Sequence, residues 1–493
     1  MGWQWRPRRA FLLPAVLGFL PILWADSLPL WSFSVMAALA LLLIPFPAFR
    51  HRNARLACLF LALLCLRAGL DQCFVVRPAL AAASRLSGET VTLQGRVSRL
   101  GELHFFTTDT DAALPAGTKL LFYPQGMEEI PDPGSRAIFS GTVKPIEGEK
   151  TFCAFCRSEG SFMRLTVTSA TQTEAPAQTL RGLLVSRLRE LLPGETGVLL
   201  GSLCLGEKGD LPRSTIIAFR RAGLPHLMVV SGLHMSVIAG SAWLILKKAI
   251  RHRKWSAIGG IITVLAFAAL VGFSASVMRA GLMTVLLMSG VFFRRKSDPI
   301  HSLSLAWVVL LLIDPRMWGD FGFLLSFGAT AGILCLTRPL VVVLQYRKPV
   351  RRRFTRLVKA AWNRLVPAIA VVLAVFFPLL PLNAWLFGTT SVISPAVNLV
   401  AVPPAGWLLV CGFIVMGCSA VGWLRPLAHV FALFSGALGK LLLWVVRLCG
   451  DIPWAYPRLP LWVSLLVSAG SLLFILWLYN KRKRRENRGR RSA

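Results

Sequence analysis

Long apolar stretches alternate with short basic segments along most of the chain. A helix needs about 20 mainly apolar residues to cross the hydrocarbon core of a bilayer, and several of these stretches approach that length. The pattern therefore predicts a polytopic α-helical membrane protein with about twelve spans. The expected spans cover residues 11–24, 28–46, 56–70, 227–246, 256–273, 276–293, 300–313, 320–337, 365–384, 391–418, 427–448 and 461–479.

The apolar stretch at residues 391–418 contains residues that disfavour a helix. Ser394-Pro395 stands near its start, and Pro403-Pro404 follows Asn398. Proline lacks the backbone donor that a helix uses, so we expect a broken helix here. Broken helices in membranes line cavities or are buried against other helices.

Residues 79–178 are polar and carry a two-residue alternation in place of a helical pattern. The alternation recurs in Val91–Val97, Lys119–Tyr123, Arg136–Val143 and Phe162–Thr168, with Gly, Pro and Asp between these segments. This pattern predicts about five strands. A small β-barrel of the oligonucleotide-binding (OB) type, inserted between membrane spans, fits this size.

Two short segments follow the β-domain. Leu180–Leu192 sets arginines against leucines, so we expect an amphipathic helix on the membrane surface. Gly197–Leu205 is apolar but too short to span, which favours a re-entrant or buried segment. We therefore expect five regions: N-terminal helices (1–78), the β-domain (79–178), these two segments (179–212), the main transmembrane domain (213–480) and a basic tail (481–493).

The composition agrees with a membrane protein. Hydrophobic residues make up 55% of the chain and charged residues only 16%, whereas soluble proteins carry about 25% charged residues. The formal net charge of +33 invites a nucleic-acid interpretation. Most of this charge, however, falls in clusters at alternate ends of successive apolar stretches, as the positive-inside rule requires. The clusters predict that both termini are cytoplasmic and that the β-domain lies outside the cytoplasm.

Cys153 and Cys156 form one close pair among ten cysteines. Disulfides can form outside the cytoplasm, so this pair is a candidate disulfide. Two free thiols in a turn are the alternative. A second CxxC motif is missing from the sequence, which argues against a four-cysteine zinc site, and we predict no metal site.

The segment Gly223–His234 places two histidines and a serine at the entrance of an apolar stretch. Gly223-Leu224-Pro225 prevents a continuous helix, so we expect the helix to begin near His226. Ser231-Gly232 permits a bend or a close helix contact. His226 and His234 would then lie on similar faces, as a polar lining or a pair sensitive to protonation. The alternative is that the serine and glycine are packing residues and the histidines cap helix ends.

Polar residues also interrupt later spans. Arg279 stands at a span end that faces away from the cytoplasm, against the positive-inside trend, so a pore or partner role competes with a snorkelling anchor. Small residues at Gly322, Ser326 and Gly328 favour a tight seam between helices. Asn398 lies among apolar residues and needs a hydrogen-bond partner, either in a pore or between helices.

Signatures of catalysis are missing from the sequence. Gly201–Lys208 imitates a phosphate loop, but Glu207 precedes Lys208, and Gly209 stands where Ser or Thr is needed. The sequence also contains no H-E-x-x-H. We therefore expect neither enzyme activity nor a cofactor, and an energy source outside this chain.

The motifs recur in a characteristic order. Gly223–His234 is close to G-L-x-H-L-L-A-I-S-G-L-H, and Gly206 stands where a Leu-Gly turn precedes that motif. Arg279–Met283 is similar to R-A-x-x-M, and Asn398–Pro403 to N-x-x-x-x-P. Gly322–Phe327 is similar to G-F-Q-L-S-F, with Leu324 in place of Gln. In this series the chain resembles the ComEC-type competence proteins, over about residues 30–480.

The resemblance implies a multi-pass protein of the bacterial inner membrane that imports single-stranded DNA during transformation. It assigns the DNA path to His226, Ser231, Gly232, His234, Arg279 and Asn398, and structural positions to Gly206, Gly223, Gly322, Phe323, Ser326 and Pro403. The β-domain would contact DNA through basic side chains and through aromatics such as Phe105 and Phe106. The two phenylalanines can equally belong to the barrel core.

The expected partners are single-stranded DNA, membrane lipid and a separate cytoplasmic helicase or ATPase, and a homo-oligomer is possible. Many members of the family carry a C-terminal metallo-β-lactamase-like domain, proposed to degrade the strand that is not transported. This sequence contains no H-x-H-x-D-H, so a nuclease would be a separate protein. Two other functions remain open: a secondary transporter for a small solute, and a membrane scaffold in which every motif is packing.

Overall fold

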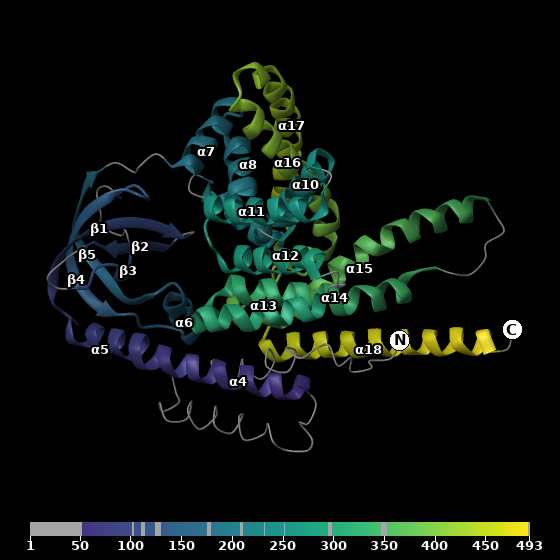
Figure 1. Ribbon diagram of the computed structural model, residues 1–493, viewed down its shortest axis with the longest axis horizontal. Helices are drawn as coiled ribbons and strands as arrows, with labels where there is room; N and C mark the ends of the chain where they lie inside the picture. Colours follow the sequence, from purple (N-terminus) through teal and green to yellow (C-terminus); the bar gives the residue numbers. More distant parts are fainter. Residues whose placement is uncertain are drawn as a thin grey trace. The chain divides into compact units, whose positions relative to one another are not determined.

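The computed structural model describes residues 52–100, 103–109, 114–123, 130–174, 179–207, 211–230, 232–250, 252–293, 298–346 and 353–491. The described part is mostly helical and includes five strands (Figure 1). The two apolar stretches expected before residue 52 lie outside the described residues. The chain divides into two units.

The first unit comprises Met1–Leu183 and Arg294–Phe323. Its described part starts with one helical run of α4, the π-helical turn η2 and α5, which leads directly into the strands. The bounds are α4 (Arg52–Asp71), η2 (Gln72–Val76), α5 (Arg77–Arg85), β1 (Thr90–Leu100), β2 (Leu103–Thr108), β3 (Lys119–Phe122), β4 (Arg136–Pro145), α6 (Lys150–Ser158), β5 (Ser161–Glu174), α13 (Pro299–Ile313) and η4 (Pro315–Gly319).

The five strands close into a barrel in the order β1-β2-β3-β5-β4, with β4 pairing back onto β1. Neighbouring strands are antiparallel except β3 and β5, which run parallel. The two-residue alternation in the sequence therefore correctly predicted strands, because successive side chains of a strand point to opposite faces.

Aromatic rings fill the barrel. The ring centroids of Phe106 and Phe122 lie 4.7 and 4.9 Å from that of Phe139. Two glycines let the strands curve tightly over this core: a Cβ on Gly95 would lie 2.1 Å from the Thr107 carbonyl oxygen, and one on Gly141 would lie 2.2 Å from that of Thr166. A side chain fits at neither position.

Helix α6 links β4 to β5 and packs on η4. A Cβ on Gly319 would lie 2.3 Å from the carbonyl oxygen of Ala154. Next to this contact the Phe155 ring stacks on Phe321, with 4.9 Å between centroids. The barrel and the segment after α13 are thus joined within one unit.

The second unit comprises Leu184–Phe293 and Leu324–Ala493. Its helices are α7 (Leu180–Leu191), α8 (Glu195–Leu205), α9 (Arg213–Arg221), η3 (Pro225–Met228), α10 (Gly232–Ile250), α11 (Arg253–Val271), α12 (Ala275–Phe293), α14 (Phe321–Leu344), α15 (Arg353–Phe387), α16 (Ser394–Ser419), η5 (Gly422–Leu424), α17 (Arg425–Gly450), η6 (Pro453–Ala455) and α18 (Leu461–Arg491). Helices α7 and α14 start in the last residues of the first unit.

Helix α8 is the buried centre of the second unit. It packs against α16 and α17, and its residues from Leu199 to Leu205 are all buried. A Cβ on Gly412 of α16 would lie 2.4 Å from the sulfur of Cys204, so the two helices touch closely. This apolar segment, too short to span a membrane, is buried as expected.

Seven helices of the described residues are long and apolar enough to cross a membrane: Cys58–Arg85, Arg253–Val271, Phe321–Leu344, Phe354–Phe387, Ser394–Ser419, Gly422–Gly450 and Leu461–Arg482. Two more of the predicted spans correspond to shorter apolar helices, Ser276–Gly290 and Pro299–Ile313. The chain is a multi-pass membrane protein. The finer count of about twelve spans stays a prediction.

The helix that we expected to start near His226 starts at Gly232. Pro225 opens the short 3-10 turn η3, where its fixed φ fits the first position, and Val229 after the turn is extended. The extended residue separates the turn from α10. The prediction that His226 and His234 share a helix is therefore wrong.

The helix break expected within residues 391–418 is also wrong. Helix α16 runs unbroken from Ser394 to Ser419. Pro395 lies in its first turn, where no backbone donor is needed. Pro403 and Pro404 lie inside the helix, and α8 and α17 pack along it. Neighbouring helices allow membrane helices to tolerate proline.

Candidate functional site

A glycine turn ends α9 at the start of the longest motif. Gly223 has φ +76°, a left-handed conformation that favours glycine. The Leu224 amide donates to the Phe219 carbonyl oxygen at 2.8 Å and closes the helix end. A Cβ on Gly223 would lie 2.5 Å from the Cβ of Ser394. The interruption of the helix predicted at this glycine is confirmed.

Asn398 joins α16 to this turn. Its Nδ2 and the Ser394 hydroxyl each donate to the Gly223 carbonyl oxygen at 3.4 Å. Within α16, the same Nδ2 donates to the Ser394 carbonyl oxygen at 2.8 Å and to its Oγ at 2.9 Å. The amide therefore ties together two segments that are 175 residues apart in the sequence.

His234 is buried in α10 and is bonded to α8. Its Nε2 makes a hydrogen bond with the Leu203 carbonyl oxygen. A carbonyl oxygen only accepts, so Nε2 carries the proton in this contact. The imidazole thus fixes α10 to the buried helix of the second unit.

Arg279 lies in α12 and is only 7% exposed. Its Nε donates to the Ser326 hydroxyl of α14 at 2.7 Å, and its Nη1 lies 3.6 Å from the sulfur of Met283. The guanidinium carbon stands 5.8 Å from the centroid of the Phe327 ring. A Cβ on Gly232 would lie 3.3 Å from Nη2, so a side chain at this position would crowd the guanidinium.

None of these neighbours neutralises the charge of Arg279. Ser326 is polar but uncharged, Met283 offers a weak acceptor and Phe327 an aromatic face. In the part of the chain that the structure describes, no acidic side chain pairs with this guanidinium. A buried cation of this kind loses its hydration without an ionic partner in return, which is unfavourable.

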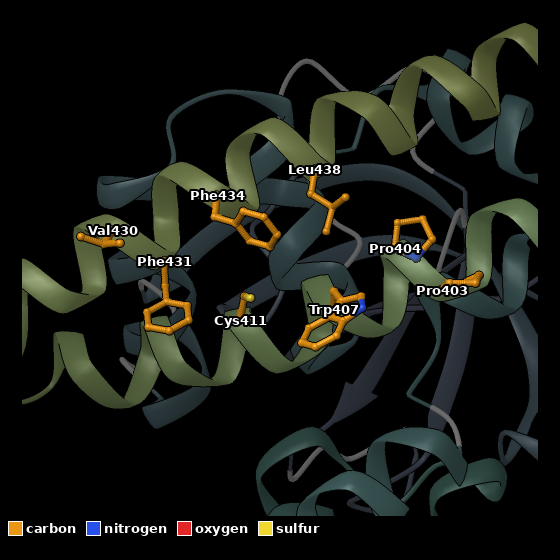
Figure 2. A pocket seen from close by; sticks show the side chains of 8 residues that line it. All are labelled: Pro403, Pro404, Trp407, Cys411, Val430, Phe431, Phe434 and Leu438. Carbon is orange, nitrogen blue, oxygen red and sulfur yellow. The ribbon is translucent and has the colours of Figure 1, made fainter.

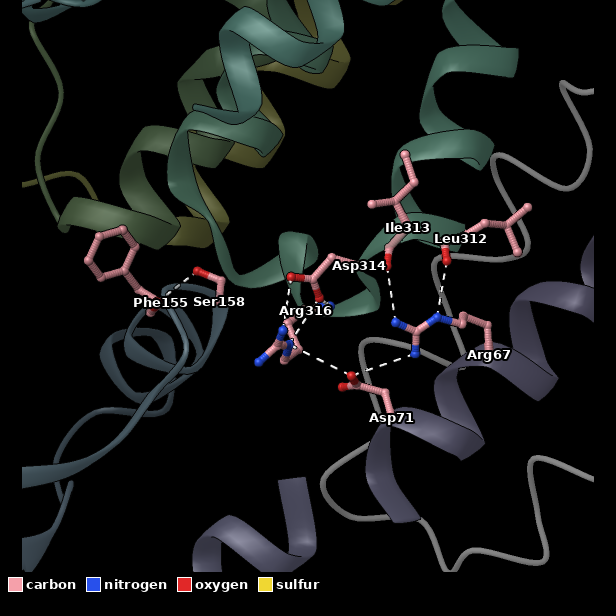
Figure 3. Close-up of polar contacts among 8 residues, drawn as sticks. All are labelled: Arg67, Asp71, Phe155, Ser158, Leu312, Ile313, Asp314 and Arg316. Carbon is pink, nitrogen blue, oxygen red and sulfur yellow. Dashed lines mark hydrogen bonds and ion pairs between the residues drawn. The ribbon is translucent and has the colours of Figure 1, made fainter. Parts of the chain in front are cut away.

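The first unit contains a contrasting case, in which a buried acidic side chain is matched by two basic ones (Figure 3). Asp71 is 3% exposed and lies 3.7 Å from Arg67 and 3.8 Å from Arg316. Arg316 also pairs with Asp314 at 3.0 Å, so two cations face two anions. Arg67 donates further to the carbonyl oxygens of Leu312 and Ile313 at 3.1 and 3.0 Å.

Sequence reasoning missed this network and a second one. The Glu195 carboxylate of α8 accepts hydrogen bonds from Thr215 of α9 and Arg447 of α17. Arg67 and Asp71 are four residues apart in an apolar stretch. This spacing places two side chains on one helix face, so the pair could have been predicted from the sequence. The Glu195 contacts join distant segments and have no comparable local signal.

The remaining candidate residues are spread over several elements. The His226 side chain is exposed on η3, and Ser231 lies outside the described residues. Gly206 caps α8 in a left-handed conformation. The Gly322 amide donates to Asp320 at 2.6 Å, and Phe323 is fully buried with its ring 4.8 Å from that of Trp307.

Pro403 lines an apolar groove between α16 and α17 (Figure 2). The groove has a volume of about 630 Å³, and the exposed Trp407 lies beside the two prolines in it. Cys411 and Phe434 continue the lining along the two helices. The walls carry almost no polar group, so the groove does not suit a charged polymer.

The structure thus brings the motif residues together as two clusters in the second unit. Asn398 meets Gly223, and Arg279 meets Ser326 beside Gly232. His234 ties the helix that contains Gly232 to α8. Among the described residues, no group of three or more His, Cys, Asp or Glu side chains is arranged to hold a metal ion.

Phe105 and Phe106 are both fully buried in the β-barrel unit, so the expectation that they stack on bases is wrong. Phe106 belongs to the barrel core, which confirms the alternative interpretation for this residue. Phe105 points to the other face of β2 and packs with Leu121 and Cys156 under α6. The helix covers the outer face of the strand, and this burial of both faces was not apparent from the alternation.

Cys153 and Cys156 are free thiols on α6 in the structure. The Cys153 thiol lies 3.7 Å from the Ile146 carbonyl oxygen. Cys156 is buried, and burial raises the pKa of its thiol to about 12, so the reactive thiolate is disfavoured. The disulfide suggested by the sequence stays a prediction.

The sequence profile of the competence protein family matches residues 203–483, more than half of the chain. The chain belongs to this family. The match begins in α8, includes Gly223, Arg279 and Asn398, and ends in α18. The helices that form both clusters are therefore those that the competence protein family shares.

Three curated relatives agree. The chain is 29% identical over 288 residues to "Competence protein ComA" of Neisseria gonorrhoeae, 25% over 274 residues to "ComE operon protein 3" of Bacillus subtilis, and 25% over 281 residues to "Recombination protein 2" of Haemophilus influenzae. These matches cover 55 to 56% of this chain but only 32 to 38% of the relatives. No solved structure matches the chain.

Proposed function

We propose that this chain is an inner-membrane channel protein that imports single-stranded DNA into the cytoplasm during transformation. Its membership of the competence protein family supports the proposal, as do relatives named for competence and recombination. The observation that carries it is the buried Arg279 without an acidic partner among the described residues.

The chemistry of Arg279 fits a polyanion. An ionisable group inside a membrane bundle is expensive and marks an ion or substrate path. Nη2 lies close to Gly232, where an added Cβ would be 3.3 Å away, and a passing phosphodiester would supply the missing negative charge. Guanidinium binds phosphate with two parallel hydrogen bonds. In this proposal Arg279 lines the path, while His234 and Asn398 hold the helices around it and His226 lies near its entrance.

We also propose a span count, an orientation in the membrane and a type of barrel. About twelve spans place both termini in the cytoplasm and the barrel outside it, as the basic clusters predict. The strand order, with β3 beside a parallel β5, supports an OB-type barrel. Since Phe105 and Phe106 are buried, any contact of the barrel with DNA would rest on its basic side chains.

The proposal also includes partners. The sequence lacks an ATP-hydrolysis signature, so a separate cytoplasmic helicase or ATPase would pull the strand. A separate nuclease would degrade the complementary strand. The chain itself would act without enzyme activity, in contact with membrane lipid, as a monomer or a homo-oligomer.

Charge variants at Arg279 test the role of this residue. Cells that carry Arg279→Gln, Arg279→Lys or the control Arg364→Gln, an exposed arginine of α15, are given labelled DNA, and nuclease-protected label is counted. We expect Arg279→Gln to lose most import, Arg279→Lys to keep part of it and Arg364→Gln to import normally. The amount of each variant in the membrane is measured as well, so that import is compared at equal protein levels. Normal import by Arg279→Gln contradicts the proposal.

A membrane scaffold is the second candidate, because His234 and Asn398 bond to neighbouring backbone. Normal function of the chain after His226→Ala and His234→Ala would favour it. A small-solute transporter would instead show solute flux in proteoliposomes that does not depend on DNA.

A further inference from the structure

Helix α9 has one face exposed, and arginines dominate that face. Arg213, Ile217, Arg220 and Arg221 are exposed, and their spacing of four, seven and eight residues puts them on the same side of a helix. Arg213 and Arg220 are about 10 Å apart along the helix axis at 1.5 Å per residue. Three positive charges therefore stand along one short face.

The opposite face of α9 is anchored in the second unit. Thr215, Ala218 and Phe219 are buried, and a Cβ on Gly450 of α17 would lie 2.9 Å from the Cα of Ala218. The Thr215 hydroxyl donates to Glu195. These contacts fix the rotation of the helix, so the arginine face cannot turn inward.

The charges of the three arginines are not balanced by the acidic side chains that the structure describes. In the described residues no acidic side chain pairs with Arg213, Arg220 or Arg221, whereas the nearby Arg447 is engaged by Glu195. A fixed row of unpaired guanidinium groups attracts an anionic polymer, since each can bind a phosphate.

Positive-inside topology does not explain this face. Helix α10 carries Lys247 and Lys248 in its last turn, which the topology proposed above places in the cytoplasm. Helix α9 precedes the other end of α10, so its arginines would stand outside, where basic residues are not favoured. A membrane-surface helix is also a poor explanation. Such a helix buries its apolar face in lipid. In α9 the apolar face is buried in protein, and among its large apolar side chains Ile217 is the exposed one, at 43%.

We propose that the exposed arginine face of α9 is a docking surface for the phosphodiester backbone of single-stranded DNA, outside the membrane and directly before the Gly223 turn. The inference rests on the proposed function. Backbone contacts of this kind are independent of base sequence. The surface would hold the incoming strand where α9 joins the family motif.

Salt-dependent binding tests this surface. The full chain in nanodiscs of zwitterionic lipid is titrated with a fluorescent single-stranded oligonucleotide at several salt concentrations. The variant is Arg213→Gln with Arg220→Gln and Arg221→Gln. The control removes the same charge from α15, with Arg356→Gln, Lys359→Gln and Arg364→Gln.

We expect the α9 variant to bind about tenfold or more weakly, and the slope of log affinity against log salt to fall by about 2, since each single-strand phosphate contact contributes about 0.7. The control should change neither. Equal affinity and slope in the α9 variant and the wild type overturn the docking surface, and so does an equal loss in the control. Loss of binding to anionic vesicles with DNA affinity unchanged assigns the face to lipid and also overturns it.

Photo-crosslinking provides a test that does not depend on a stability change. A benzophenone amino acid replaces Ile217 in the centre of the face, or Leu357, which is exposed beside Arg356. We expect labelled single-stranded DNA to crosslink at position 217 and not at 357, and equal crosslinking contradicts the proposal. A wild-type chain that binds no single-stranded DNA contradicts the proposed function itself, whereas loss of the difference between variants contradicts only this surface.

Discussion

Asn398 and Ser394 both donate to the carbonyl oxygen of Gly223, so one backbone atom is the point where two distant segments meet. Hydrogen bonds between membrane helices contribute about 0.6 to 2 kcal/mol each. The conformation of Gly223 matters more, because its φ of +76° and the close approach of Ser394 exclude a side chain.

Gly223→Ala should destabilise the folded chain by about 2 kcal/mol or more, from left-handed strain and overpacking. Thermal unfolding in detergent, followed by tryptophan fluorescence, measures this. Gly406→Ala on α16 is the matched control, since a Cβ there meets nothing within 4 Å, and it should be neutral. Equal melting temperatures for the two variants would contradict the role of the Gly223 turn.

Asp320, in the first unit, should make the stability of the protein depend on pH. Its carboxylate accepts from the Gly322 and Phe323 amides, yet burial, with the nearby Glu159 carboxylate, raises its pKa to about 6. A raised pKa means that the folded state favours the protonated form. This contribution to stability is therefore complete below the ordinary carboxyl pKa and is lost as the pH rises through about 6.

Asp320→Asn keeps the helix cap and removes this titration. Between about pH 4 and pH 7 the melting temperature of the wild type should fall relative to that of the variant. Parallel curves for the two proteins would show that Asp320 does not titrate in this range.

At the scale of elements, the barrel depends on close strand contacts. Gly141→Ala would force a Cβ against the Thr166 carbonyl oxygen and should cost about 1 to 3 kcal/mol. Hydrogen exchange of peptides from β4 and β5 should increase in this variant. It should stay unchanged in Thr168→Ala, an exposed position of β5. Unchanged exchange in both variants would mean that the strands do not approach as closely as the structure has them.

Elements with a strong local pattern could be predicted from the sequence, and those that depend on neighbours could not. The alternation located the strands because its period is a property of the chain itself. The prolines of α16 suggested a break because the local sequence does not show that α8 and α17 pack along this helix. Likewise, the burial of Phe105 depends on α6, which covers the outer face of β2.

The residues of the candidate site could be predicted from the sequence, but the contacts between them could not. The motif order correctly identified the family, and the need of Asn398 for a partner was evident from its apolar neighbours. That the partner is the Gly223 carbonyl, and that Arg279 bonds to Ser326, follows from contacts over 47 to 175 residues, which no local pattern encodes.

At the scale of the whole molecule, the chain is a multi-pass helical protein of the competence family, and it contains a buried cation that no described acidic side chain pairs with. The net charge of +33 includes both topological clusters and the exposed arginines of α9. A polyanion that crosses the membrane would explain why arginines occur where topology does not require them.

The most direct measurement is import of labelled DNA into cells from which the gene is deleted. Nuclease-protected label in the cytoplasm is compared between the deletion, the complemented strain and the wild type, and electroporated DNA serves as the control that bypasses the proposed channel. We expect the deletion to lose protected label, complementation to restore it and electroporation to yield normal transformants. Undiminished cytoplasmic label in the deletion strain would contradict the proposed DNA import.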